Sequence, residues 1–163
     1  MKGHDEVIAG LNDLLALELT AMDQYFVHSE MYADWGLFAL YDRIAHEFDD
    51  EKRHAKALIE RILFLEGRPD MVTREPLQIG GDVPEMLRFD LNVEYTVAAR
   101  LKEVMALCEV HRDFETRHVL QPLLEDTEVD HAWWLEQQLG LIEKLGLQNY
   151  LQSQTGTAPT AER

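Results

Sequence analysis

Four helical stretches, each with a glutamate in its apolar stripe, constrain this sequence most. Apolar residues recur there every three or four positions, the spacing of an amphipathic α-helix. A carboxylate interrupts each stripe at a place where an apolar side chain would otherwise continue it. The stretches cover residues 5–35, 37–66, 82–108 and 114–145, and the interrupting glutamates are Glu18, Glu51, Glu94 and Glu128.

The two halves of the sequence repeat this arrangement. In each half, a helix with one glutamate precedes a helix with Glu-x-x-His, and the glutamates are separated by 33 residues in the first half and 34 in the second. No strand pattern competes, so the predicted fold class is all-α, an antiparallel four-helix bundle. The Pro- and Gly-containing residues 68–83 are expected to form a long crossover connection between the pairs.

The end of the chain predicts a short fifth helix. Gly146 should end the fourth helix, residues 147–152 form the fifth, and the polar residues 153–163 form a flexible tail. We therefore expect one domain over residues 1–152.

The stripes of a four-helix bundle converge on a common axis, which would bring the polar stripe residues together. A buried carboxylate lowers the stability of the fold by on the order of several kcal/mol unless it is paired or binds a metal. Four carboxylates balance two divalent cations, and mixed oxygen and nitrogen ligands favour iron or manganese. One Glu-x-x-His alone is more typical of a solvated helix face, but two in register predict a dinuclear metal site. Its predicted ligands are Glu18, Glu51, His54, Glu94, Glu128 and His131.

Composition narrows the classes of partner. The chain has 31 Asp and Glu against 15 Lys and Arg, a formal charge of −16. This acidity disfavours nucleic acid and anionic membranes and favours cations. Cys108 is the single cysteine, so a disulfide or a cysteine-ligated metal site within one chain is excluded. The N-terminus lacks the apolar core of a signal peptide, so the cytoplasm is the expected location.

The sequence also resembles the bacterioferritins of the ferritin superfamily, over residues 1 to about 154. The resemblance implies a ferroxidase centre at the six residues above, with Glu51 and Glu128 bridging two irons, inside a cage of twenty-four subunits. It is carried by the metal motif and by MKG (1–3), DQYF (23–26), WGL (35–37), ERILFLEG (60–67) and GLQNYL (146–151).

The resemblance suggests roles for further residues, each with an ordinary alternative. Tyr25 matches a redox-active tyrosine beside the centre, or is a core tyrosine. His46 and Asp50 match a pair that in some bacterioferritins binds a further iron on the cavity wall, or are solvated residues. Trp134 matches an aromatic residue near the centre, or serves packing alone.

Two features depart from the family pattern. Bacterioferritins bind haem b between two subunits through a methionine that follows the first bridging glutamate, and here that position is Lys52. Lysine is not expected to replace it, so the chain either forms a haem-free shell or assembles with a second, methionine-bearing subunit type. The approach to the fourth helix, residues 116–122, also holds one extra residue. A π-bulge or a kink at Pro122 would keep Glu128 and His131 facing inward, whereas a register shift would turn them away.

The predicted function is iron storage and detoxification. Fe(II) would be oxidised by dioxygen or peroxide and deposited as mineral inside the cage, with a ferredoxin-like reductant possible for release. The alternatives are a di-iron or di-manganese redox enzyme acting on peroxide or an organic substrate, and a non-catalytic shell subunit of a mixed bacterioferritin.

Overall fold

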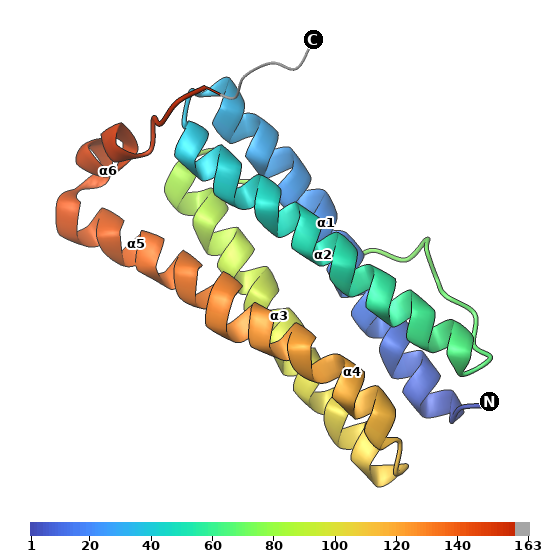
Figure 1. The fold of residues 1–163 in the computed structure, drawn as a ribbon. Coiled ribbons are helices and arrows are strands. Elements are labelled where there is room, and N and C mark those ends of the chain that lie inside the picture. Colours follow the sequence, from blue (N-terminus) through green and yellow to red (C-terminus); the bar gives the residue numbers. More distant parts are fainter. Residues whose placement is uncertain (159–163) are drawn as a thin grey trace.

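The fold is the predicted all-α four-helix bundle with a short additional helix (Figure 1). The computed structural model describes residues 1–158, and none of these forms a β-strand. The bundle has four long helical rods, and the fourth rod consists of three consecutive elements, of which the middle one is a π-helix. The elements are α1 (Asp5–Asp34), α2 (Phe38–Phe64), α3 (Val83–Val110), α4 (Phe114–Glu125), η1 (Asp126–Ala132), α5 (Trp133–Leu145) and α6 (Leu147–Ser153).

The connection between α2 and α3 is a long crossover that returns along the bundle, so α2 and α3 run in the same direction (Figure 1). Polar side chains of α1 hold this segment through its backbone N–H groups. Thr20 Oγ1 accepts from Glu75 N at 2.9 Å, and Gln24 Oε1 accepts from Gln78 N at 3.1 Å. The predicted crossover is therefore an ordered part of the fold.

A buried network fixes the end of the crossover. His28 Nε2 accepts from Gly80 N at 3.3 Å, while His28 Nδ1 lies 2.8 Å from Asp90 Oδ1. Gln24 Nε2 donates to the same Asp90 oxygen at 2.8 Å. A Cβ atom at Gly80 would lie 2.5 Å from the backbone nitrogen of Met86, so this approach requires glycine.

Side chains cap the starts of α1, α3 and α4 but not the start of α2. Asp82 and Asp113 cap α3 and α4 by accepting backbone N–H groups three residues later, at 2.8 and 3.0 Å. The side chain before α2 makes no capping bond. Instead, the first two N–H groups of α2 donate to the carbonyl oxygens of Thr155 and Gln154, each at 3.1 Å. The start of the expected tail thus packs on α2, and residues 159–163 lie outside the described part.

The hydrophobic core consists of two clusters separated along the bundle. One cluster contains Leu11, Leu58 and Leu101, from one end of the bundle. The other contains Ile44 and Leu87, from the opposite end. The predicted polar stripe residues occupy the layer between them. Within residues 1–158, no helix has the length and apolar character needed to cross a bilayer.

Candidate metal centre

Five of the six predicted ligands meet in the interior of the bundle. Each is at most 4 % exposed, and four rods of the bundle supply them. They form two groups of three whose ligand atoms all lie within 4.8 Å of one another, and both groups include one shared residue. The groups are Glu18, Glu51 and His54, and Glu51, Glu94 and His131.

Glu51 connects the two groups through its two carboxylate oxygens. Oε2 lies 3.1 Å from His54 Nδ1, and Oε1 lies 3.1 Å from His131 Nδ1. The outer carboxylates complete the groups, because Glu18 Oε2 is 3.9 Å from His54 Nδ1 and Glu94 Oε1 is 3.5 Å from His131 Nδ1. One oxygen of Glu51 therefore faces each group, as a bridging carboxylate requires.

The donor atoms fit divalent cations. Both oxygens of Glu18 and Oε2 of Glu94 are buried without a hydrogen-bond partner, and both nitrogens of His131 lack hydrogen-bonding geometry to the carboxylates around them. Buried polar groups without partners are rare in native proteins. Carboxylate oxygens and imidazole nitrogens suit iron, manganese and zinc, so a pair of cations would satisfy these atoms.

Without metal, the cluster holds protons. Burial favours the neutral form of His54, but attraction to the Glu18 and Glu51 carboxylates outweighs it and raises the pKa of His54 to about 11. Burial and the charge of Glu51 raise the pKa of Glu18 well above its ordinary value. Burial likewise raises the pKa of Glu94, to about 7, with Glu51 adding to it. Cations would displace these protons, because metal ligands bind deprotonated.

Further acidic residues hold the far side of each imidazole. His54 Nε2 lies 3.1 Å from Asp126 Oδ2, and His131 Nε2 lies 2.7 Å from Glu47 Oε2. The hydrogen bond with Asp126 fixes the ring orientation of His54, and Glu47 lies close to His131 without hydrogen-bonding geometry. Nδ1 of each histidine is thus left toward its ligand group. Glu47 lies four residues before Glu51 in the sequence, so the spacing of the second stripe was a signal for it. Asp126 had no signal in the sequence, because its position depends on the π-helix.

Glu128 does not join the cluster, contrary to the prediction that it and His131 both face inward. Its side chain is 41 % exposed and forms an ion pair with Lys102 on α3. The structure has a π-helix, η1, where the expected extra residue would require a π-bulge, and Pro122 lies inside α4. A π turn bonds residue i to i+5 and holds about one residue more than an α turn. Asp126, five residues before His131, therefore shares its face, and Glu128, three before it, does not.

Thr127 takes an interior position on η1. It is 1 % exposed, and its Oγ1 has no hydrogen-bond partner. It precedes His131 by four residues, close to one π turn, so the two share a face of the helix. The pattern predicted that a fourth carboxylate, Glu128, would face inward from this helix. The neutral hydroxyl of Thr127 faces inward instead.

Tyr25 and the His46–Asp50 pair lie next to the cluster. The fully buried Tyr25 hydroxyl donates to Glu94 Oε1. His46 Nε2 is 3.5 Å from Asp50 Oδ2, and Asp50 Oδ2 is 3.6 Å from His131 Nε2. His46 is 58 % exposed, so Asp50 connects a surface imidazole to a buried one.

Two other predicted positions do not belong to the ligand groups. Lys52 lines an apolar groove of about 800 Å³ together with Met22 and Met71. The Trp134 ring lies under the guanidinium of Arg43, with 5.1 Å between the Cζ atom and the ring centre. Stacking of this kind accounts for the position of Trp134.

Comparisons with known proteins agree with this architecture. The ferritin-like domain family matches residues 8–145. A bacterial ferritin of Synechocystis sp. is 60% identical over 154 residues, which cover 94% of this chain and 99% of the relative. A bacterial ferritin of Pseudomonas aeruginosa is 56% identical with the same coverage. A bacterioferritin of Brucella melitensis is 41% identical over 99% of this chain and all of the relative.

Proposed function

Because the chain belongs to the ferritin superfamily and is of the bacterioferritin type, we propose that its buried cluster is a di-iron ferroxidase centre that feeds iron storage. The cluster binds two Fe(II) ions as substrates. Each ion gives up one electron, and the two electrons reduce dioxygen to peroxide, or peroxide to water, with protons taken up. The Fe(III) product passes to a mineral inside a cage.

The single observation that carries this proposal is the position of Glu51. Each of its oxygens lies 3.1 Å from the Nδ1 atom of a different histidine. A carboxylate placed this way holds two cations side by side, so both electrons are available at one site. The remaining ligands, Glu18 and Glu94, each belong to one group only.

The two halves of the centre differ in how easily they release an ion. Each group has one buried outer carboxylate, Glu18 or Glu94. The His131 group has Thr127 on its helix face and Glu128 outside. It therefore holds one carboxylate fewer than the motif predicted, and we expect this half to release Fe(III) more readily.

Asp50 and His46 offer a path from that half to the surface. Asp50 is 4 % exposed and lies near both His131 and the exposed His46. We assign the pair as a further iron site on the cavity wall. We propose that Tyr25, hydrogen-bonded to Glu94, is the redox-active tyrosine beside the centre that the resemblance suggests.

Membership of the family supports a multi-subunit cage. We propose a cage of twenty-four subunits in the cytoplasm, with a ferredoxin-like protein as reductant for release. Because Lys52 faces the groove in place of a methionine, a homomeric cage should bind no haem b, and haem would require a second, methionine-bearing subunit.

The test is an anaerobic Fe(II) titration of metal-free protein, followed by oxygen addition with the ultraviolet absorbance of Fe(III)-oxo species recorded. We expect a fast phase that saturates at two irons per chain and disappears in Glu18→Ala. Glu30→Ala is the matched control, because Glu30 is an exposed glutamate on the same helix. A parent protein without a saturating fast phase would identify a non-catalytic shell subunit.

A saturating phase that is never followed by mineral growth would favour the alternative of a redox enzyme. Electron microscopy of the iron-loaded protein separates these outcomes, since a mineral core scatters strongly inside a closed shell.

A further inference from the structure

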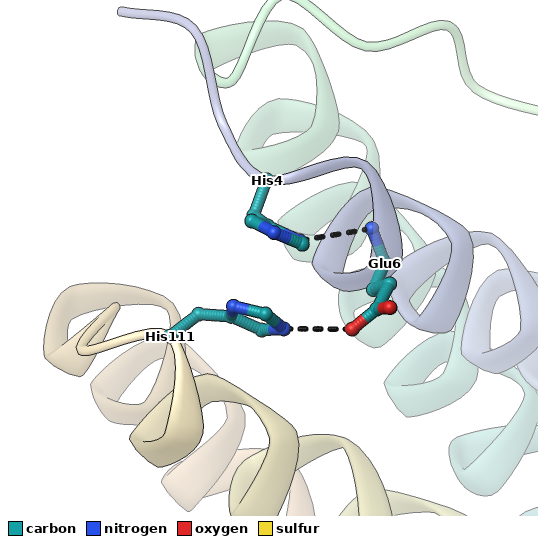
Figure 2. Close-up of side chains that lie close together, drawn as sticks. All are labelled: His4, Glu6 and His111. Atoms are coloured by element: carbon teal, nitrogen blue, oxygen red, sulfur yellow. Dashed lines mark hydrogen bonds and ion pairs between the residues drawn. The ribbon is translucent and has the colours of Figure 1, made fainter.

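We propose that His4, Glu6 and His111 form a second, exchangeable binding site for a divalent transition metal of the Zn²⁺ class. The site lies at the end of the bundle where α1 begins and α3 ends, and it shares no residue with the ferroxidase centre (Figure 2). The proposal is independent of the proposed ferroxidase function.

The two imidazoles are already arranged together. The rings of His4 and His111 stack with 3.5 Å between their centres and an angle of 21° between their planes. Figure 2 shows the Glu6 carboxylate beside them, with Oε2 at 2.8 Å from His111 Nε2. One nitrogen from each ring and one oxygen of Glu6 lie within 4.8 Å of one another.

Small side-chain movements would complete coordination. At Zn–N and Zn–O distances of about 2.0–2.2 Å, tetrahedral ligand atoms lie roughly 3.3 Å apart. His4 and Glu6 are exposed and His111 is partly exposed, so their rotamers can adjust. His4 Nδ1 currently accepts the Glu6 backbone N–H at the longer distance of 3.3 Å, a weak bond that coordination could replace.

The charges around this cluster favour the binding of a cation. His111 is the C-cap of α3, where the partial negative charge of the helix end favours a cation. The opposite effect comes from the N-terminus of α1, but Asp5 and Glu6 lie in its first turn and offset it. A metal would also replace the proton that an ion pair between His111 and Glu6 requires.

The donor set determines the class of metal. Two imidazoles and one carboxylate suit Zn²⁺, Cu²⁺, Ni²⁺ or Fe²⁺ better than Mg²⁺ or Ca²⁺. Three protein ligands leave a coordination position open, which is typical of sites that exchange ligands or ions. Binding would tie the start of α1 to the end of α3.

The experiment counts Zn²⁺ per chain by equilibrium dialysis of the assembled, metal-free protein. We expect His111→Gln to bind one Zn²⁺ fewer per chain than the parent. His4→Ser should lose the same ion while keeping a side-chain oxygen able to cap α1. His118→Gln is the matched control, since His118 is an exposed histidine outside the cluster.

A second readout separates this site from the buried centre. Glu18→Ala should lose ions from the centre but keep the ion that His111→Gln loses. Zn²⁺ should also raise the thermal unfolding midpoint of Glu18→Ala, and adding His111→Gln should make that increase smaller. Equal Zn²⁺ stoichiometry and affinity in the parent, His4→Ser and His111→Gln would overturn the proposal, whatever the result for iron oxidation.

Discussion

Lys102 of α3 holds the carboxylate of Glu128 at the outer side of the π-helix, while His131, three residues further on, is fully buried. In an α-helix these residues would share a face and form the second half of a Glu-x-x-His motif. The one-residue difference between an α turn and a π turn thus removes one carboxylate from the candidate metal centre.

This arrangement predicts unequal effects of two glutamate substitutions. Glu94→Gln removes a buried ligand and should slow the fast phase of Fe(II) oxidation by more than the ~10–100-fold typical of partners outside the ligand set. Glu128→Gln removes only an exposed ion pair and should change the rate by less than about twofold. Stopped-flow absorbance measures both. A large loss in Glu128→Gln would show that this carboxylate turns inward when iron binds.

Deleting Thr127 should restore the α-helical register. Glu128 would then lie on the inner face, three residues before His131, because the extra residue that requires the π turn is gone. We expect tighter binding of the second Fe(II) and slower transfer of Fe(III) to the mineral. Anaerobic titration and the rate of core growth test this, with Thr127→Ala as the control that keeps the length. If the deletion variant binds the second Fe(II) ion with unchanged affinity, the change of helical register does not explain the weaker site.

Removing the Tyr25 hydroxyl should make iron binding more sensitive to pH. Its hydrogen bond lowers the pKa of Glu94, which burial and Glu51 raise to about 7. In Tyr25→Phe this pKa should rise further, so a larger fraction of Glu94 is protonated at pH 6–7 and Fe(II) binds less tightly. At pH 9 the difference from the parent should shrink. A binding deficit that is equal at both pH values would exclude this cause.

The metal-free protein should lose stability as the pH rises. The folded pKa of His54, about 11, exceeds its ordinary value of 6.5. Its stabilising contribution is therefore complete below about pH 6.5 and is lost between there and about pH 11. The raised pKa of Glu18 acts in the same direction. Thermal unfolding should give a lower midpoint at pH 9 than at pH 6.5, and His54→Gln should reduce this slope.

Asp90 should be important for the stability of the crossover. It accepts from Gln24 and pairs with His28, and all three side chains are buried. Asp90→Ala leaves both partners unsatisfied, which should cost roughly 3 kcal/mol. Asp23→Ala is the control, since it breaks a more exposed ion pair to Arg74 on the same crossover and should cost about 1 kcal/mol or less. Urea unfolding midpoints compare the two.

The sequence by itself determined the bundle and most of its centre. Apolar residues every three or four positions specify four helices, and a carboxylate in such a stripe is expected to point into the core, as Glu18, Glu51 and Glu94 do. Gly146, with φ of 78°, ends the fourth rod where the sequence predicted. These features follow from local periodicity and chain geometry.

Only the tertiary structure decided how the fourth rod meets the site. Both a kink and a π turn could absorb the extra residue, and the choice depends on packing against α2 and α3. The π turn brings Asp126 to His54 and turns Glu128 to Lys102. A prediction from helical periodicity assumes a constant rotation per residue, so it assigns side chains to the wrong face where that rotation changes. The stacking of His4 on His111, more than one hundred residues apart, likewise depends on how the helix ends meet.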